Sequence, residues 1–323
     1  MRRVFFGVVI IALFASLVSA EADPEPTHGP YQFGPDSKVQ PGVPQGKWEK
    51  YFFDKSEIYP GTTREIWIYI PAQYDGKEPA CLMVFQDGPR QYAVRENEVD
   101  RPSRKTAEYR AASVFDNLIY KKELPLIIGV FINPGSRTIA ANGQPDFANR
   151  SVEYDTVSDT YSQFLLKEIL PPIEAKYNIR KDPAGRAIGG ISSGAICAFT
   201  VAWNHPDVFG KVHSDVGSFT NIRGGHVYPQ LVKDSPKKPL KIAMEDGTND
   251  NTGPDRSGQA RPPERDWYLQ NKLMHENLLA KGYEVRYVLG DNVHGSAHAG
   301  PIFPDQMRWL WKDQLKLTTQ ESH

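Results

Sequence analysis

The sequence predicts an α/β fold with a mostly parallel central sheet flanked by helices. From residue 125 onward, strand-like and helix-like segments alternate, which is typical of parallel strands joined by helices. Residues 125–132 form an almost wholly apolar run, as expected for a central strand buried on both faces. The chain has 323 residues, enough for one large domain with a substantial core, so a second domain is not required.

The expected elements begin with a β-rich entry at residues 48–53, 64–70 and 80–86. A charged stretch without a clear period, residues 89–112, is interpreted as a long surface insertion near the mouth of any site. Apolar spacing predicts a helix over residues 158–177. The remaining strands are expected at residues 186–191, 211–216, 240–244 and 284–289, and the remaining helices from residue 195 to 204 and around residues 266–281 and 304–316.

The N-terminus has the features of a cleavable export signal. Two arginines follow Met1, an apolar run covers residues 4–18, and Ala20 precedes an acidic stretch. An uncleaved anchor is the alternative, but an apolar run of about 15 residues is shorter than the roughly 20 that span a bilayer. We expect a signal peptide at residues 1–20, a flexible leader at residues 21–46 and a folded domain at residues 47–318. Such a protein would be exported, either periplasmic or secreted.

The net charge gives no indication of a nucleic-acid or membrane partner, and the sequence around the two cysteines indicates whether they form a disulfide. The formal net charge is −1 at pH 7, so nothing favours a nucleic acid or an anionic membrane surface as the partner. The two cysteines, Cys81 and Cys197, both lie in apolar segments. We expect both to be buried free thiols rather than a disulfide or a metal site.

The motif Gly190-Ile191-Ser192-Ser193-Gly194 has the form of a nucleophile elbow. In such an elbow a serine lies on a strained strand-to-helix turn, and glycines are needed where the two backbones nearly touch. A short buried strand is expected before the motif and a helix after it, which is the order the motif requires. The pattern nominates Ser192 as a nucleophile.

A serine nucleophile needs a histidine base, and that histidine needs a carboxylate to orient it. Asp250 is the first candidate for the acid, because it lies on the loop expected after the strand at 240–244, and Asp246 on the same loop is the second. The alternative is that this loop has no catalytic role and is an ordinary Asp/Gly-rich turn with solvated carboxylates.

Two histidines, His294 and His298, follow the last expected strand. His294 is favoured because it follows the strand sooner and precedes a glycine, and His298 is the alternative. A metal site is disfavoured, since the residues between the two histidines do not suit a helix and no third ligand is evident. We therefore expect neither a metal nor another cofactor.

An oxyanion hole requires backbone N–H groups directed at the developing negative charge. Ser193, at the head of the elbow helix, is expected to supply one. The second is expected from the loop after the strand at 80–86, where Pro89 has no N–H. Gly88 is the candidate there, with Arg90 as an alternative.

Several of these segments together resemble the enterochelin-esterase branch of the putative esterase (esterase D) family. The resemblance covers roughly residues 46–311 and is carried by the segments 85–88 (FQDG), 149–155 (NRSVEYD), 168–171 (EILP), 190–194 (GISSG), and His294 with the helix that contains 309–311 (WLW). It implies an α/β-hydrolase fold and serine esterase activity, and it favours His294 over His298. Enterochelin esterases often carry an acid and a tryptophan after the catalytic histidine, whereas Gly295, Ser296 and Ala297 follow here.

Two further segments are expected to rim the substrate pocket. One segment contains Asn149 and Arg150, and the other contains Ser218 and Arg223. Asp87, which precedes Gly88, is also expected to contact the substrate. Arg150 or Arg223 could bind a carboxylate or a sugar hydroxyl. The alternative is that both arginines are solvent-facing ion-pair partners.

These observations predict an exported serine carboxylesterase that uses Ser192, His294 and Asp250. Its expected partner is a small-molecule ester, with an aryl, siderophore or carbohydrate-linked group. An acyltransferase to a sugar or lipid hydroxyl, and a non-catalytic siderophore or glycan-binding protein, are the competing hypotheses.

Overall fold

A computed structural model describes residues 25–92, 108–137, 149–255 and 257–320. The signal peptide expected at residues 1–20 lies outside this part of the chain. In the described residues, eight strands form a single sheet in the order β1-β2-β4-β3-β5-β6-β7-β8. The strands are β1 (Lys47–Phe53), β2 (Arg64–Ile70), β3 (Cys81–Gln86), β4 (Ile127–Ile132), β5 (Arg186–Ile191), β6 (Lys211–Asp215), β7 (Lys241–Asn249) and β8 (Glu284–Val293).

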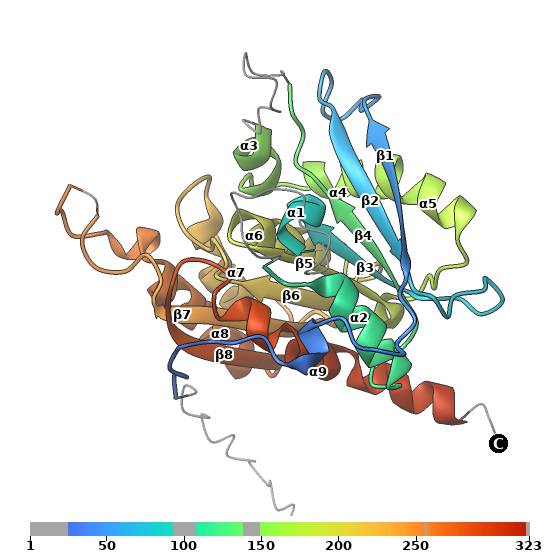
Figure 1. Ribbon diagram of the computed structural model, residues 1–323. Coiled ribbons are helices and arrows are strands. Elements are labelled where there is room, and N and C mark those ends of the chain that lie inside the picture. Colours follow the sequence, from blue (N-terminus) through green and yellow to red (C-terminus); the bar gives the residue numbers. More distant parts are fainter. Residues whose placement is uncertain (1–24, 93–107, 138–148, 256, 321–323) are drawn as a thin grey trace, which may run out of the picture.

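The sheet is mostly parallel, as the sequence predicts. β1 pairs with β2, and β2 with β4, in antiparallel fashion, whereas all other neighbouring strands are parallel. The central strands β3, β4 and β5 are buried at every position. Their continuous apolar sequences follow from this position, because helices cover both faces of the sheet (Figure 1).

Two separate apolar cores lie on the two faces of the sheet. One contains side chains from α3 to α8, and the other contains side chains from α1, α2 and α9 (Figure 1). The helices are α1 (Gly88–Tyr92), α2 (Ala111–Tyr120), α3 (Arg150–Tyr154), α4 (Thr160–Phe164), α5 (Leu170–Lys176), α6 (Ser193–Asn204), α7 (Tyr228–Asp234), α8 (Trp267–Ala280) and α9 (Ala299–Gln320).

Some expected elements differ from those observed. The helix expected over residues 158–177 is divided into α4, a π-helical turn at Leu165–Ile169, and α5. Of the surface insertion expected at residues 89–112, the segment 93–107 lies outside the described residues. The flanking parts are not surface structure, since Tyr92, Tyr109 and Ala111 are fully buried. Cys81 and Cys197 are buried free thiols, as expected.

The strands β7 and β8 extend further than the sequence suggests, and this affects the site. The sequence predicts strand ends at residues 244 and 289, but β7 runs to Asn249 and β8 to Val293. The additional residues pair with each other across a register shift between Gly247 and Asn249. As a result, Asp246 lies within a strand, whereas Asp250 lies just beyond its end.

Of the flexible leader expected at residues 21–46, the structure describes residues 25–46, and part of this stretch is bonded to β8. The Thr27 N–H donates to the carbonyl of Leu289 at 2.8 Å, and the Asp291 N–H donates to the carbonyl of Thr27 at 3.0 Å. The Tyr31 hydroxyl donates to Asp291 Oδ1 at 2.6 Å. β8 is an edge strand, so its backbone groups are open to pairing, and Thr27 occupies part of that edge. We call residues 27–31 the N-terminal clasp.

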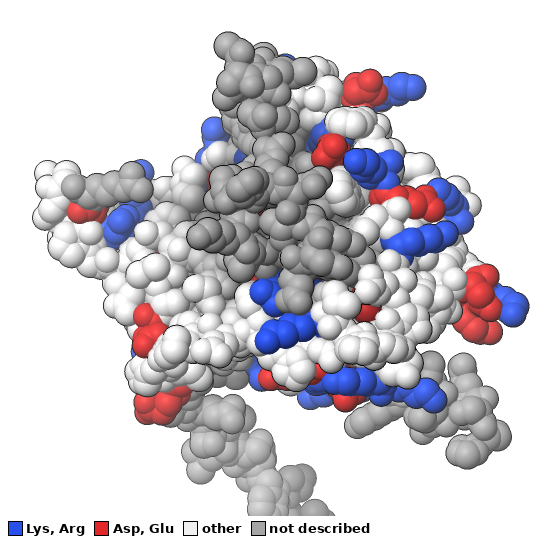
Figure 2. All heavy atoms as spheres, viewed as in Figure 1, with Lys and Arg blue, Asp and Glu red and all other residues white. Residues whose placement is uncertain are grey.

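On the face shown in Figure 2, lysine and arginine side chains lie intermixed with aspartate and glutamate rather than in a patch of one sign. Within the described ranges, no helix combines the length and the hydrophobicity that crossing a bilayer requires.

Replacing Tyr31 with alanine should destabilise the domain. The substitution removes the hydroxyl bonds to Thr27 and Asp291 and the contact of the ring with His298, whose centroid lies 4.5 Å away. We expect a loss of about 1–2 kcal/mol in the free energy of unfolding, measured by urea denaturation. Tyr120→Ala is the matched control, because this tyrosine on α2 is 54% exposed and should change stability by less than about 0.5 kcal/mol. Equal effects of the two substitutions would contradict a structural role for the clasp.

Candidate active site

Ser192 lies on a sharp turn between β5 and α6. Its backbone has φ 57° and ψ −120°, a strained conformation for a residue with a side chain. A Cβ added to Gly190 would collide with the backbone of Gly194, and one added to Gly194 would lie 2.8 Å from Asp87 Oδ2. The close backbone approach requires glycine at position 190, which is the geometry of a nucleophile elbow, whereas Gly194 leaves room for the Asp87 side chain after β3.

Ser192, His294 and Asp250 are the expected nucleophile, base and acid, and we call them the relay. Each lies within hydrogen-bond distance of the next. His294 Nε2 lies 2.8 Å from Ser192 Oγ, and His294 Nδ1 lies 2.6 Å from Asp250 Oδ1. In the arrangement that fits a carboxylate at Asp250, Nδ1–H donates to the carboxylate and Nε2 accepts the serine proton. Asp250 is fully buried, whereas the imidazole of His294 is 27% exposed, so solvent reaches the base but not the acid.

The loop that carries Asp250 is fixed on both sides. The Asp250 N–H donates to the carbonyl of Gly247 at 2.9 Å, and the Tyr268 N–H at the start of α8 donates to the carbonyl of Asp250 at 3.2 Å. Asp246 instead lies fully buried within β7, and among the described residues no hydrogen bond joins it to His294. Burial, together with the nearby charge of Asp250, raises the pKa of Asp246 well above its usual value.

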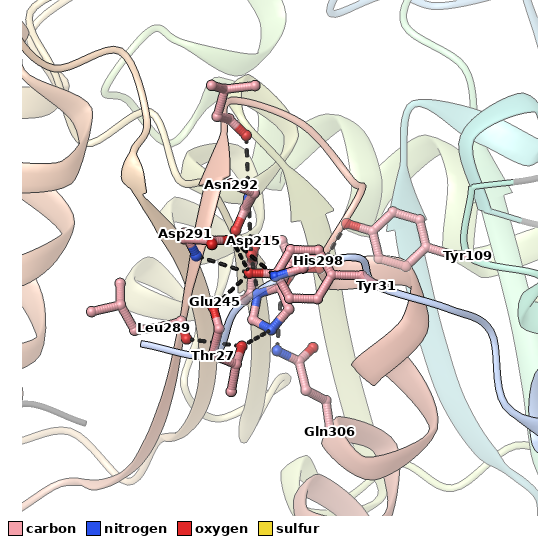
Figure 3. Close-up of polar contacts among 12 residues, drawn as sticks. Thr27, Tyr31, Tyr109, Asp215, Glu245, Leu289, Asp291, Asn292, His298 and Gln306 are labelled. Atoms are coloured by element: carbon pink, nitrogen blue, oxygen red, sulfur yellow. Dashed lines mark hydrogen bonds and ion pairs between the residues drawn. The ribbon is translucent and has the colours of Figure 1, made fainter. Parts of the chain in front are cut away.

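His298, the alternative base, lies behind the site rather than in it. Its Nδ1 is 2.9 Å from Glu245 Oε1, and its Nε2 is 3.0 Å from Thr27 Oγ1 of the clasp (Figure 3). The imidazole is 1% exposed, and burial lowers its pKa to about 4. His298 therefore anchors the far end of the loop that presents His294.

The two expected oxyanion donors, Ser193 and Gly88, are each the first residue of a helix. Ser193 begins α6 and Gly88 begins α1. N–H groups in the first turn of a helix have no intrahelical acceptor, and among the described residues neither N–H donates to another backbone carbonyl. Gly88 has φ 67°, and a Cβ there would collide with the side chain of Asn133. The neighbouring Asp87 N–H is already used, because it donates to the Tyr154 hydroxyl at 3.1 Å.

A cavity of about 430 Å³ opens beside Ser192, and most of the residues that line it are polar or charged. Its lining residues are Asp87, Gln91, Glu108, Asn133, Pro134, Arg150, Ile191, Ser192, His294, Gly295 and Ser296. Arg150 forms a two-pronged ion pair with Asp87, with distances of 2.5 and 2.8 Å. The Ser296 hydroxyl, also in the lining, donates to Glu108 Oε2 at 2.5 Å.

The other residues expected to rim the pocket have different positions. Asn149 is buried and donates to Glu153 Oε1 at 2.5 Å, so its contact is structural. Arg223 donates to the Ser151 hydroxyl at 3.3 Å and is absent from the cavity lining. Ser218 is buried beside the nucleophile, with its Oγ 3.2 Å from Ser192 Oγ.

The cavity-lining residues Gln91 and Glu108 belong to the segment 89–112 that the sequence places near the mouth of a site, although neither residue is singled out there. Nothing in the sequence points to Trp267. Trp267 is the first residue of α8, and its indole N–H donates to the Ser218 hydroxyl at 3.1 Å. The helix itself was expected, but nothing in its spacing indicates that its first residue faces Ser192. Across the described ranges, no three or more His, Cys, Asp or Glu side chains gather in a way that could hold a metal ion.

Comparisons with known proteins identify relatives of this chain. A model of the putative esterase family matches residues 58–313. An uncharacterized protein of Bacillus subtilis, YbbA, is 20% identical over 257 residues, which are 77% of this chain and 92% of that protein.

Solved structures of similar fold include two kinds of esterase. The enterobactin esterase FES of Shigella flexneri superposes with a TM-score of 0.62 and 19% identity, over 88% of this chain and 64% of that protein. The chain thus spans somewhat less than two thirds of that esterase. A ferulic acid esterase of Anaeromyces mucronatus superposes with a TM-score of 0.61 and 18% identity, over 87% of this chain and 98% of that protein. These neighbours have the α/β-hydrolase fold, and the fold expected from the sequence is confirmed.

Replacing Asp250 with asparagine should strongly slow the reaction of Ser192 with a fluorophosphonate probe. An amide at this position no longer favours the tautomer of His294 that accepts the serine proton, so we expect the rate constant to fall by about 10³-fold or more. Asp246→Asn is the matched control, since Asp246 does not touch His294, and its rate should fall by less than about tenfold. A larger loss in Asp246→Asn, with both variants folded, would move the acid to Asp246.

Proposed function

This chain belongs to the putative esterase family, and we propose that it hydrolyses carboxylic esters through a covalent acyl-enzyme on Ser192. The observation that carries the proposal is the continuous relay from Ser192 Oγ through His294 to Asp250, with distances of 2.8 and 2.6 Å. A serine on an elbow, joined to a histidine that is itself joined to a buried carboxylate, is the arrangement that activates a serine hydroxyl.

In the first half of the reaction, Ser192 Oγ attacks the ester carbonyl carbon while His294 Nε2 takes its proton. The carbonyl oxygen becomes an oxyanion, which the N–H groups of Ser193 and Gly88 stabilise. Collapse of this intermediate breaks the bond to the leaving alcohol, and His294 returns the proton to that oxygen. The products of this half are the free alcohol and an acylated Ser192.

In the second half, His294 takes a proton from water, and the resulting hydroxide attacks the acyl carbon. The ester bond to Ser192 breaks, His294 returns the proton to Oγ, and the carboxylic acid leaves. The partial exposure of His294 supports water as the acceptor of the acyl group, because solvent reaches the base directly. Each step uses side chains and backbone groups of this chain together with substrate and water.

The polar cavity supports a substrate that bears hydroxyl or other hydrogen-bonding groups. Carboxylates of Asp87 and Glu108 and the guanidinium of Arg150 lie on its walls, next to amides of Gln91 and Asn133. An aryl, siderophore or carbohydrate-linked ester offers such groups, and the structural neighbours are named for enterobactin and for ferulic acid. From the signal expected at residues 1–20, we further propose that the activity lies outside the cytoplasm, in the periplasm or the medium.

The proposal predicts ester hydrolysis that depends on Ser192. The mature protein should hydrolyse nitrophenyl acetate, butyrate, octanoate or ferulate, and Ser192→Ala should lower kcat by about 10³-fold or more on every ester that is turned over. Release of nitrophenol, followed by absorbance, is the measurement. Equal rates in the two proteins would exclude Ser192 as the nucleophile.

A competing alcohol separates hydrolysis from acyl transfer. With glycerol added to the same assay, chromatography of the products should show free acid as the major product. A dominant glycerol ester would instead identify an acyltransferase on the same fold.

A further inference from the structure

Ser218 is hydrogen-bonded both to Trp267 and to the expected nucleophile, Ser192. The Ser218 hydroxyl oxygen lies 3.2 Å from Ser192 Oγ and 3.1 Å from Trp267 Nε1. Ser218 is 1% exposed, so its hydroxyl has little access to solvent and depends on these partners. Neither residue belongs to the relay of Ser192, His294 and Asp250.

The chemistry of the groups fixes the direction of these bonds. An indole N–H only donates, so Ser218 Oγ is the acceptor from Trp267. The Ser192 proton is directed to His294 Nε2, because Nδ1–H is used on Asp250. Between the two serines, Ser218 must therefore be the donor. The bonds run in one direction, from Trp267 through Ser218 and Ser192 to His294 and Asp250.

Backbone hydrogen bonds fix the position of Ser218 beside Ser192. The Ser218 N–H donates to the carbonyl of Ser192 at 3.1 Å, and the Ser192 N–H donates to the carbonyl of Asp215 at 2.9 Å. The loop after β6 is thus bonded directly to the elbow. Asn271 holds the same loop to α8, since its side-chain amide donates to the carbonyl of Gly217 at 2.8 Å.

Trp267 is equally fixed at the start of α8. Asp266 caps the helix by accepting the Leu269 N–H at 2.9 Å, and the Tyr268 N–H donates to the carbonyl of Asp250. The indole ring meets the His294 ring edge-on, with centroids 5.7 Å apart. Trp267 therefore contacts both the base and, through Ser218, the nucleophile, while its helix is bonded to the acid loop.

We propose that Ser218 donates a hydrogen bond to the nucleophilic oxygen of Ser192 and that Trp267 positions Ser218 for this role. The bond holds Ser192 Oγ with its proton toward His294, and it strengthens as negative charge develops on that oxygen during proton transfer. Its contribution is thus larger in the transition state than in the resting enzyme, which raises kcat rather than substrate affinity. The inference rests on the proposed function of Ser192.

The test compares Ser218→Ala, Trp267→Phe and the double variant, in nitrophenyl ester hydrolysis and in labelling of Ser192 by a small fluorophosphonate. Phenylalanine keeps an aromatic ring beside His294 but removes the N–H. Loss of one hydrogen bond to the nucleophile should lower kcat and the labelling rate by about five- to tenfold with little change in KM. The double variant should be no slower than Ser218→Ala, because both substitutions interrupt the same chain of bonds.

Three further variants separate this role from a loss of packing. Ser218→Thr keeps the hydroxyl and should recover most of the activity lost in Ser218→Ala. Ser113→Ala and Trp309→Phe are the matched controls: Ser113 is a buried serine on α2, and Trp309 lies on α9 against Lys241. Both should match the wild type in activity, and thermal unfolding of every variant identifies any that fail to fold.

Two outcomes would overturn the proposal. Wild-type kcat and labelling in Ser218→Ala would show that the bond contributes nothing. An increase in KM that varies with the acyl group, while labelling by the small probe stays unchanged, would make Ser218 a substrate-binding residue instead. Failure of the proposed function is distinguishable, because hydrolysis would then persist in Ser192→Ala or be absent from the wild type as well.

Discussion

The close approach of β5 and α6 at Gly190 and Gly194 is the constraint on which the rest of the site depends. Because glycine has no side chain, the strand and the helix can approach closely, with the single residue Ser192 between them at the turn. That turn leaves Ser192 in a strained conformation and places the Ser193 N–H at a helix start. The remaining components reach Ser192 from loops at the carboxyl ends of β3, β6, β7 and β8, as is general for ligand sites in open α/β sheets.

Thr27, Glu245 and His298 form a hydrogen-bonded group next to the loop that carries His294. The Thr27 hydroxyl donates to the carbonyl of Leu289, so its oxygen accepts the Nε2–H of His298. In a neutral imidazole Nδ1 then has no proton, and Glu245 must supply the hydrogen between them as a neutral acid (Figure 3). The pKa directions agree, since burial lowers the pKa of His298 and raises that of Glu245. Burial likewise raises the pKa of Asp246, which lies near the Asp250 side chain that contacts His294.

The sequence was most informative where short-range pattern and chemistry coincide. The glycines around Ser192, an acidic loop and a histidine after the late strands could be predicted, because a serine nucleophile requires an acid and a histidine in that chain order. Contacts between distant segments could not. Trp267 faces Ser218 only because α8 packs beside the loop after β6, and Asn149 is turned to Glu153 although its neighbour Arg150 lines the cavity.

The N-terminal clasp illustrates the same limit. Its proline and glycine content favours a flexible segment, and local composition carries no information about an open edge on β8, which is more than 250 residues away in the chain. Likewise, Asp246 and Asp250 could not be separated by sequence, because the choice depends on how far β7 continues to pair with β8. Strand pairing of this kind is a property of the sheet, not of either segment.

The central claim, that Ser192 carries the acyl group during turnover, can be tested by mass spectrometry. The mature protein is mixed with nitrophenyl acetate, quenched in acid before the steady state, and digested. We predict one added acetyl group on the peptide that contains Ser192, formed at least as fast as nitrophenol is released in steady-state turnover. Turnover with that peptide unmodified, or with the acetyl group on a different residue, would contradict the account.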